Sequence, residues 1–174
     1  MKITKVVVGT LEENCYVLEK DRKVIVVDPG DEYNKIKKAI GFKKVVGVLI
    51  THNHFDHVGV LDKFDQSIVY KYDNLEEKEY NIGPFNFEVI FTPGHTEDSV
   101  SYYFKEDNIL FDGDFVFRLA IGRCDLEGGD YKEILNSIDK IKKYPKDMTI
   151  CPGHGDHTEL GYEIEHSLYF KRGK

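Results

Sequence analysis

Apolar residues recur along the chain in short runs that are separated by glycine, proline and charged residues. Valine, isoleucine, tyrosine and phenylalanine dominate these runs, which is typical of β-strands. The run 45–50 is continuously apolar and therefore predicts a strand buried on both faces. The ranges predicted as strands are 3–8, 14–18, 24–27, 45–50, 67–70, 87–92, 100–104, 108–111 and 148–151.

Helices are predicted over 33–40, 58–64, 131–144 and 158–170. The clearest is 131–144, whose apolar residues recur at helical spacing and face inward: Ile134, Leu135, Ile138 and Ile141. Several strands precede a mixed region, and a helix, a strand and a helix follow it. This order favours a layered α/β sandwich with helices outside two sheets over a purely alternating parallel fold. No linker or change of composition divides the chain, so we expect a single domain over 1–174.

Metal-ligand side chains cluster directly after the apolar run 45–50. The stretch 51–57 contains His52, His54, Asp56 and His57. Imidazole nitrogen and carboxylate oxygen are ligands for zinc and iron. A polar surface loop rich in histidine is the alternative, but four such residues at the end of a buried strand favour a metal site.

Three other predicted strands end in a glycine-containing turn with a ligand-type side chain. These turns contain Pro93-Gly94-His95, Asp112-Gly113-Asp114 and Pro152-Gly153-His154. Each of them alone is commonly an ordinary turn, but strand ends converge in space. Seven candidate ligands exceed one tetrahedral site and suit two adjacent cations that share one ligand. A carboxylate can bridge two cations, and Asp114 is the best candidate, with Asp112 as its competitor.

Composition excludes several other classes of protein. Formal net charge is −7 with no isolated basic run, so we expect no binding to nucleic acid. No apolar run approaches the length of a membrane span. The three cysteines have no paired spacing, and the apolar run near the N-terminus is too short for a secretory signal, so we expect reduced thiols and a cytoplasmic protein. Cys151 is expected to be a small buried hydrophobic residue.

The four motifs, in this order, resemble those of the metallo-β-lactamase superfamily. Asp28-Pro29-Gly30 and Asn14-Cys15-Tyr16 also match its opening strands. The resemblance implies a four-layer αββα sandwich with the metals at the open edge between the sheets. It implies a first metal bound by His52, His54, His95 and Asp114. It implies a second bound by Asp56, His57, His154 and the shared Asp114.

A shared aspartate is similar to the pattern of the glyoxalase II-type thioesterases. The segment around Arg123 is similar to one in small glyoxalase II-like proteins, in which Arg123 would bind a substrate carboxylate or thiolate. An ordinary ion pair with Asp125 or Asp130 is the alternative for Arg123. Full-length glyoxalase II enzymes carry a C-terminal helical domain, and we expect this protein to have none.

These observations predict a hydrolase that attacks a small hydroxyacyl-glutathione-like thioester through a metal-bridging hydroxide, with Asp56 orienting it. Two zinc ions are expected, with iron or manganese as alternatives. Asp28 and the hydroxyls of Thr51 and Thr92 are expected to support the ligands. The competing interpretation is a persulfide dioxygenase with one non-haem iron on His52, His95 and Asp114. A non-catalytic metal-storage protein ranks last.

Overall fold

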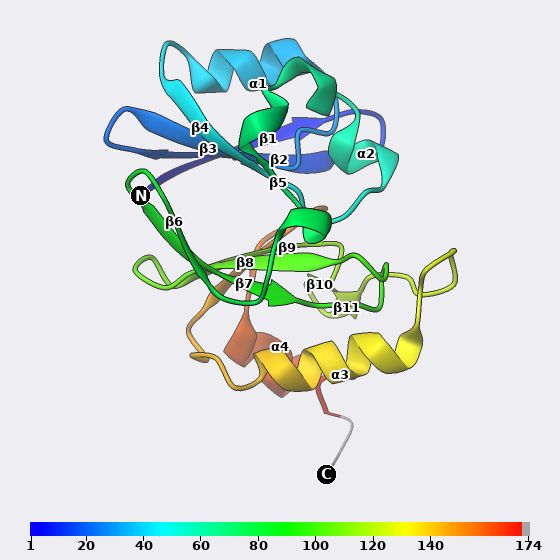
Figure 1. Ribbon diagram of the computed structural model, residues 1–174. Coiled ribbons are helices and arrows are strands. Elements are labelled where there is room, and N and C mark those ends of the chain that lie inside the picture. Colours follow the sequence, from blue (N-terminus) through cyan, green and yellow to red (C-terminus); the bar gives the residue numbers. More distant parts are fainter. Residues whose placement is uncertain (172–174) are drawn as a thin grey trace.

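Two β-sheets lie face to face in the computed structural model, which describes residues 1–171, and helices cover both outer faces (Figure 1). The first sheet is antiparallel from β1 to β3 and parallel from β3 to β5. Its strands, in spatial order, are β1 (Lys2–Val8), β2 (Glu13–Lys20), β3 (Lys23–Val27), β4 (Lys44–Leu49) and β5 (Val69–Tyr70).

The second sheet is antiparallel except where β9 and β12 run side by side in the same direction. Its strands, in spatial order, are β13 (Thr158–Glu159), β12 (Thr149–Pro152), β9 (Ile109–Gly113), β8 (Val100–Phe104), β7 (Phe85–Phe91) and β6 (Glu79–Ile82). A separate short hairpin consists of β10 (Val116–Phe117) and β11 (Ala120–Ile121).

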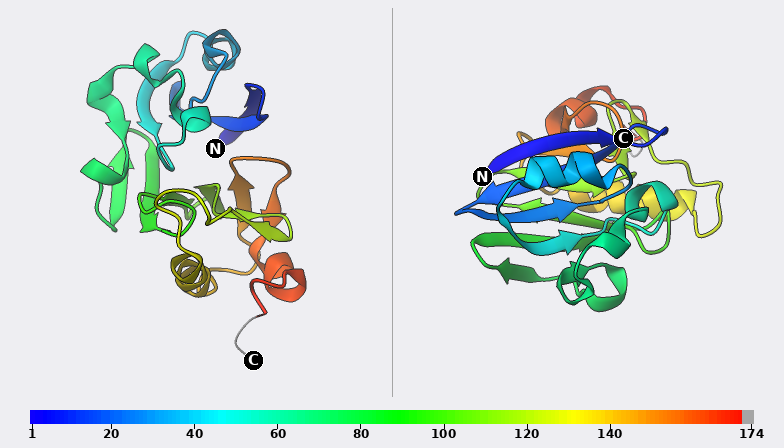
Figure 2. Two further views of the ribbon diagram at one scale, coloured as in Figure 1. Left: turned by 90° about the vertical axis from the view of Figure 1, so that its right-hand side faces the viewer. Right: turned by 90° about the horizontal axis from the view of Figure 1, so that it is seen from above.

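Helix α1 (Tyr33–Ile40) lies outside the first sheet, and α3 (Tyr131–Ile141) and α4 (Leu160–His166) lie outside the second (Figures 1 and 2). The Asp130 carboxylate caps α3 by accepting hydrogen bonds from the amides of Lys132 and Glu133. The remaining helical pieces are α2 (Phe55–Val58) and three 3₁₀ turns, η1 (Leu61–Lys63), η2 (Gln66–Ile68) and η3 (Tyr72–Asn74).

Side-chain alternation along the strands creates three apolar layers. In β2, Tyr16 and Leu18 join the core between the sheets, whereas Cys15 and Val17 join the cluster that contains Ile36 of α1. A third cluster packs the second sheet against α3 and α4. Successive strand residues point to opposite faces, so one strand can supply two layers. The arrangement confirms the predicted four-layer αββα sandwich.

The largest errors in the predicted elements lie at helix ends. The helix predicted over 58–64 is instead α2 and η1, because the Val60 amide donates to the Pro29 carbonyl at 3.1 Å and does not continue the helix. Gly59 packs against the Gly30 carbonyl, where a Cβ would come within 2.2 Å. In the helix predicted over 158–170, Thr158–Glu159 pairs with β12 as β13, and α4 ends before Ser167.

The short strands β6, β10 and β11 were not predicted, because their apolar runs are too brief to show a period. Within the described residues, no helix is both long and apolar enough to cross a membrane. The three cysteines form no disulfide, and Cys151 is buried in the core between the sheets, as predicted.

Candidate metal centre

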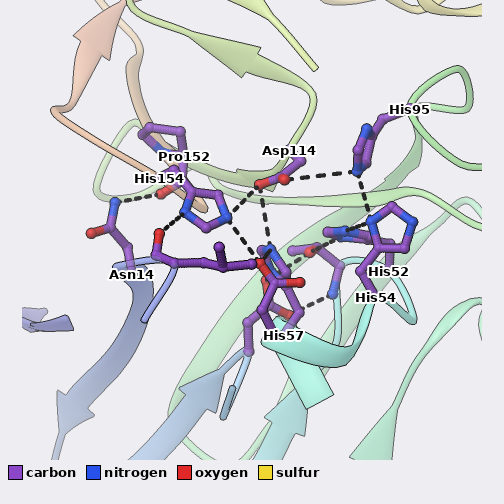
Figure 3. Close-up of polar contacts among 12 residues, drawn as sticks. Asn14, His52, His54, His57, His95, Asp114, Pro152 and His154 are labelled. Atoms are coloured by element: carbon purple, nitrogen blue, oxygen red, sulfur yellow. Dashed lines mark hydrogen bonds and ion pairs between the residues drawn. The ribbon is translucent and has the colours of Figure 1, made fainter. Parts of the chain in front are cut away.

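The seven predicted ligands converge at one edge of the sandwich. Figure 3 shows His52, His54, His57, His95, Asp114 and His154 directed toward one another. His52 and His54 follow β4, and Asp56 and His57 form the first turn of α2. The remaining three follow strands β7, β9 and β12 of the second sheet and are His95, Asp114 and His154. Both sheets therefore contribute ligands to the site through the ends of their strands. That these residues bind metal remains a prediction.

Three imidazoles form a first group. The Nδ1 atom of His54 lies 3.1 Å from His52 Nε2 and 3.0 Å from His95 Nε2. Three ring nitrogens that meet at this spacing offer a set of lone pairs to a single cation, and imidazole suits zinc, iron and copper.

A second group consists of Asp56, His57 and His154. His154 Nε2 lies 3.2 Å from Asp56 Oδ2, and His57 Nε2 lies 3.9 Å from the same oxygen. Both histidines present Nε2 to the site, and His57 is completely buried.

Asp114 lies between the two groups. Its Oδ1 is 3.4 Å from His57 Nε2 and 3.6 Å from His154 Nε2. Its Oδ2 is 3.7 Å from His95 Nε2. One carboxylate thus directs one oxygen to each group, which is the arrangement expected of a bridging ligand.

Three observations test whether a divalent cation fits. Among residues 1–171, His57 Nε2 and Asp114 Oδ1 are buried polar atoms without a hydrogen-bond partner, and such atoms are rare unless a ligand satisfies them. A Cβ on Gly153 would lie 2.5 Å from both Asp114 Oδ1 and His57 Cε1, so only glycine leaves this space free. The donors are the imidazoles and carboxylates that zinc and iron prefer. The His/Asp cluster therefore fits a divalent metal.

Hydrogen bonds on the outer side of the histidines fix their ring orientation. His57 Nδ1 donates to Asp28 Oδ2 at 2.9 Å. His95 Nδ1 donates to the Arg123 carbonyl at 2.7 Å, and His154 Nδ1 donates to the Leu11 carbonyl at 3.0 Å. Each bond leaves Nε2 free for the site, as is usual for metal-binding histidines.

Asp28 and Thr51 have the supporting roles predicted for them. The Asp28 carboxylate accepts hydrogen bonds from the Thr51 amide at 2.8 Å and the Thr51 hydroxyl at 2.6 Å. Thr51 Oγ1 also lies 3.1 Å from His52 Nδ1. The prediction for Thr92 is wrong, because its hydroxyl is paired with Ser101 Oγ at 2.8 Å.

Asp112, the competitor of Asp114, belongs to none of the clusters of donor atoms found among residues 1–171. Its Oδ2 accepts a hydrogen bond from the Val116 amide at 3.0 Å, at the start of the short hairpin. Burial raises the pKa of Asp112 well above its usual range. Its geometry leaves Asp114 as the bridging candidate.

Two histidines of the first group, His52 and His54, favour the neutral form. Burial, together with the neighbouring His57, lowers the pKa of His52 well below its usual value. Burial and the adjacent His95 lower the pKa of His54. Neutral imidazoles keep the lone pairs that a cation requires.

Carboxylates dominate the electrostatics of the second group. The hydrogen bond to Asp56 raises the pKa of His154. Burial opposes protonation of His57, but Asp114 and Asp28 outweigh it and raise the pKa of His57. Burial alone would raise the pKa of Asp114, but the neighbouring histidines, His57 foremost, lower it to about 2.

The start of β2 holds the 152–155 turn in place, across the gap between the sheets. Asn14 Nδ2 donates to the carbonyls of Pro152 and Gly155, both at 3.0 Å, and the first of these bonds is drawn in Figure 3. The Tyr16 hydroxyl donates to the same Pro152 carbonyl at 2.7 Å. Asn14 and Tyr16 thereby position His154.

Two hollows adjoin the centre. A cleft of about 420 Å³ is lined by His95, Asp114, Phe117, Arg123, His154 and Gly155. A larger groove of about 870 Å³ passes His54 and includes four carboxylates among its lining residues: Asp73, Glu97, Asp98 and Glu127. A substrate can therefore reach both candidate groups from solvent.

Arg123 lines the cleft, yet its guanidinium is paired with a neighbour. Arg123 Nε and Nη2 donate to the two oxygens of Asp125 at 2.8 and 2.9 Å, and the Arg123 side chain is 61% exposed. The ion pair was the alternative interpretation of this residue, and a role in substrate binding stays a prediction.

Glu13 is the residue of this region that the sequence patterns did not reveal. It begins β2, and its carboxylate lies close to the carboxylate of Asp28 and to the ring of His57. Burial raises the pKa of Glu13 to about 10. The only sequence signal is an acidic residue at the first position of a strand that proves to be buried.

Comparisons with known proteins agree with this geometry. The family model of the metallo-beta-lactamase superfamily matches residues 8–85 and 68–154. A probable metallo-hydrolase of Bacillus subtilis, YqgX, is 34% identical and aligns with 92% of this chain and 93% of its own length. The chain belongs to the metallo-beta-lactamase superfamily and is a metal-dependent hydrolase.

More distant relatives carry more specific names. The hydroxyacylglutathione hydrolase GloC of Haemophilus influenzae is 28% identical over 94% of this chain and 95% of its own. The crystal structure of the BLEG-1 B3 metallo-beta-lactamase has a TM-score of 0.92 at 30% identity and covers 98% of this chain and 100% of that one. TTHA1623 in a di-iron-bound form has a TM-score of 0.87 at 29% identity, over 95% and 99% of the two chains.

Proposed function

We propose that the chain is a binuclear, zinc-dependent thioesterase of the glyoxalase II type. The observation that carries the proposal is the position of Asp114, whose two oxygens face two different groups of ligands. His52, His54 and His95 would hold the first ion, Asp56, His57 and His154 the second, and Asp114 both.

Bound divalent cations would lower the pKa of a coordinated water toward neutrality and polarise the substrate carbonyl. The chain supplies the remaining functions. Asp56 Oδ2 would orient that water and accept its proton, and His154 Nε2, which lies 3.2 Å from this oxygen, would bind the same ion as Asp56. The cleft beside Asp114 and His154 is the place for the carbonyl group that is attacked.

A thioester suits this centre because a thiolate leaves without needing a strong proton donor. Resemblance to the hydroxyacylglutathione hydrolase GloC supports the same class of substrate. We place the protein in the reducing cytoplasm, in keeping with its unpaired cysteines, and expect a small-molecule substrate and neither a nucleic acid nor a membrane partner. The four carboxylates in the adjacent groove disfavour a thiol carrier with a high negative charge, because like charges repel.

The competing persulfide dioxygenase would use one iron on His52, His95 and Asp114. That interpretation leaves Asp56, His57 and His154 without a role, although their donor atoms lie within 4.8 Å of one another. The complete second group therefore favours hydrolysis.

The test uses metal-free protein that is reloaded with zinc. We expect two zinc ions per chain by elemental analysis and thiol release from S-D-lactoylglutathione or from an uncharged thioester. Asp114→Asn should reduce the affinity for the second zinc ion by about 100-fold or more and should abolish turnover. Loss of a residue that only hydrogen-bonds to a metal ligand costs about 10- to 100-fold in affinity, and loss of a ligand itself should cost at least as much. Asp139→Asn, which removes an exposed carboxylate on α3, is the matched control and should retain both.

Three outcomes would contradict the proposal. One is wild-type turnover by Asp114→Asn with both ions retained. Another is a single iron per chain with oxygen uptake from glutathione persulfide. The third is hydrolysis of a β-lactam with no activity on any thioester, which would instead align the chain with BLEG-1.

A further inference from the structure

Glu13 carries a buried carboxylate that no other group satisfies. Its side chain is 1% exposed, and within residues 1–171 neither of its oxygens has a hydrogen-bond partner. Burying an ionised carboxylate without hydrogen bonds is costly unless an opposite charge compensates for it. A cation bound nearby would supply that charge.

The Glu13 carboxylate lies directly behind the second group of ligands. A Cβ on Gly30 would be 2.8 Å from Glu13 Oε2 and 1.7 Å from the Asp56 carbonyl, so Gly30 allows the two to approach. A Glu13 oxygen, an Asp28 oxygen and a His57 nitrogen lie within 4.8 Å of one another. The Glu13 backbone also forms a β-bridge with His154. Glu13 thus lies beside His57 and His154 and near the backbone of Asp56.

Glu13 is not part of a separate cation site. His57 Nδ1 is occupied by its hydrogen bond to Asp28, and His57 Nε2 faces Asp114. No imidazole nitrogen therefore remains for an ion between Glu13 and Asp28. The carboxylate can act on the second group only through its charge and through the residues it touches.

We propose that Glu13 is a positioning residue for the second metal ion: its buried carboxylate compensates the charge of that ion from behind Asp56 and His57 and strengthens its binding. The inference rests on the binuclear centre proposed above. Opposite charges attract strongly where water is excluded. The coupling is reciprocal, so a cation that stabilises the buried carboxylate is itself bound more tightly.

The effect should be confined to one ion. The first group, His52, His54 and His95, shares no cluster of donor atoms with Glu13. Removal of the Glu13 charge is therefore expected to leave the first ion bound and to loosen the second.

The experiment compares three variants by titrating metal-free protein with zinc against a chelating indicator and with cobalt by absorption spectroscopy. Glu13→Gln keeps the shape and removes the charge, and should weaken the second ion by about 10- to 100-fold while the first is unchanged. Glu13→Asp keeps the charge and should recover part of that loss.

Glu163→Gln is the matched control. Glu163 is also completely buried but lies on α4, where its carboxylate accepts hydrogen bonds from the Thr158 hydroxyl at 2.5 Å and the Leu119 amide at 3.0 Å. The Glu163→Gln variant should bind both ions with the same affinities as the wild type. If Glu13→Gln does not fold, Glu13→Met fills the same volume without charge and is expected to show the same selective loss.

Equal binding of both ions by wild type and Glu13→Gln would overturn the inference and leave the proposed function intact. Equal weakening of both ions would overturn it as well, because a general structural role would then suffice. Three ions in the wild type and two in Glu13→Gln would make Glu13 a direct ligand instead. A wild-type chain that binds only one ion would refute the binuclear centre and, with it, this inference.

Discussion

His57 shows, at the scale of single residues, how the chain prepares a ligand. Its Nδ1 is bound to Asp28, Asp28 is held by the amide and hydroxyl of Thr51, and its Nε2 is left buried without a partner among the described residues. A ring held on one side and unsatisfied on the other has little freedom to lose when a cation binds.

Gly153 is the residue at which the smallest change should have a large effect. An added methyl group would lie 2.5 Å from Asp114 Oδ1 and from His57 Cε1, so one of them must move. Gly153→Ala should therefore lose at least the second metal ion, while its circular dichroism spectrum stays native. Gly155→Ala is the control for the added methyl group, because no atom lies within 4 Å of a Cβ at Gly155, and its positive φ (+74°) adds a backbone strain that Gly153→Ala does not have. Equal metal content in the two variants would contradict this prediction.

At the scale of elements, strand ends bring the ligands together. The ends of β4, β7, β9 and β12 meet at one edge, and the short helix α2 adds Asp56 and His57. The beginning of β2 joins this edge from the other direction and carries Glu13, Asn14 and Tyr16. A single strand thereby supplies both core residues and the contacts that hold the 152–155 turn.

Tyr16→Phe tests that connection. The variant loses the hydrogen bond to the Pro152 carbonyl, which should cost about 1 kcal/mol of unfolding free energy. It should also weaken the second ion, because His154 follows Pro152. Tyr103→Phe loses a comparable bond to Asn108 Oδ1 at 3.0 Å, remote from the ligands, and should change stability alone. Urea unfolding with and without zinc measures both effects. The prediction is wrong if the two variants bind the second ion equally well.

At the scale of the whole molecule, the candidate centre connects the two sheets. His52 and His54 belong to the first sheet's strand ends, whereas His95, Asp114 and His154 belong to the second. Ions bound to this set cross-link the layers and stabilise the folded state in proportion to their affinity. Their positive charge also offsets part of the formal net charge of −7.

The two ions should leave at different pH. Protons compete with metal for imidazole, and a raised pKa lets a histidine take up its proton at higher pH. The pKa values of His57 and His154 are raised, whereas those of His52 and His54 are lowered. As the pH falls, the second ion should therefore leave before the first, and thermal stability should fall in two steps.

Cobalt spectra and melting curves over a pH series measure this order. His154→Ala, which retains the first group, provides the reference spectrum of that group alone. Release of both ions in a single step, or loss of the first group's spectrum before that of the second, would contradict the prediction.

The amino-acid sequence determined the layers and the chemistry of this protein. Alternating apolar residues in short runs predict the strands, and each of four strands is followed by at least one metal-ligand side chain, so the fold class and the seven candidate ligands follow from local patterns. Glu13 and the backbone carbonyls of Leu11 and Arg123 could not be found in this way. Every residue has a carbonyl, and burial of an acidic side chain depends on what packs over it. The tertiary structure alone decided which oxygen of Asp114 faces which group of histidines and that Asp112 faces neither group. The sequence could not decide this, because the distances from Asp114 to the histidines depend on how the two sheets pack together.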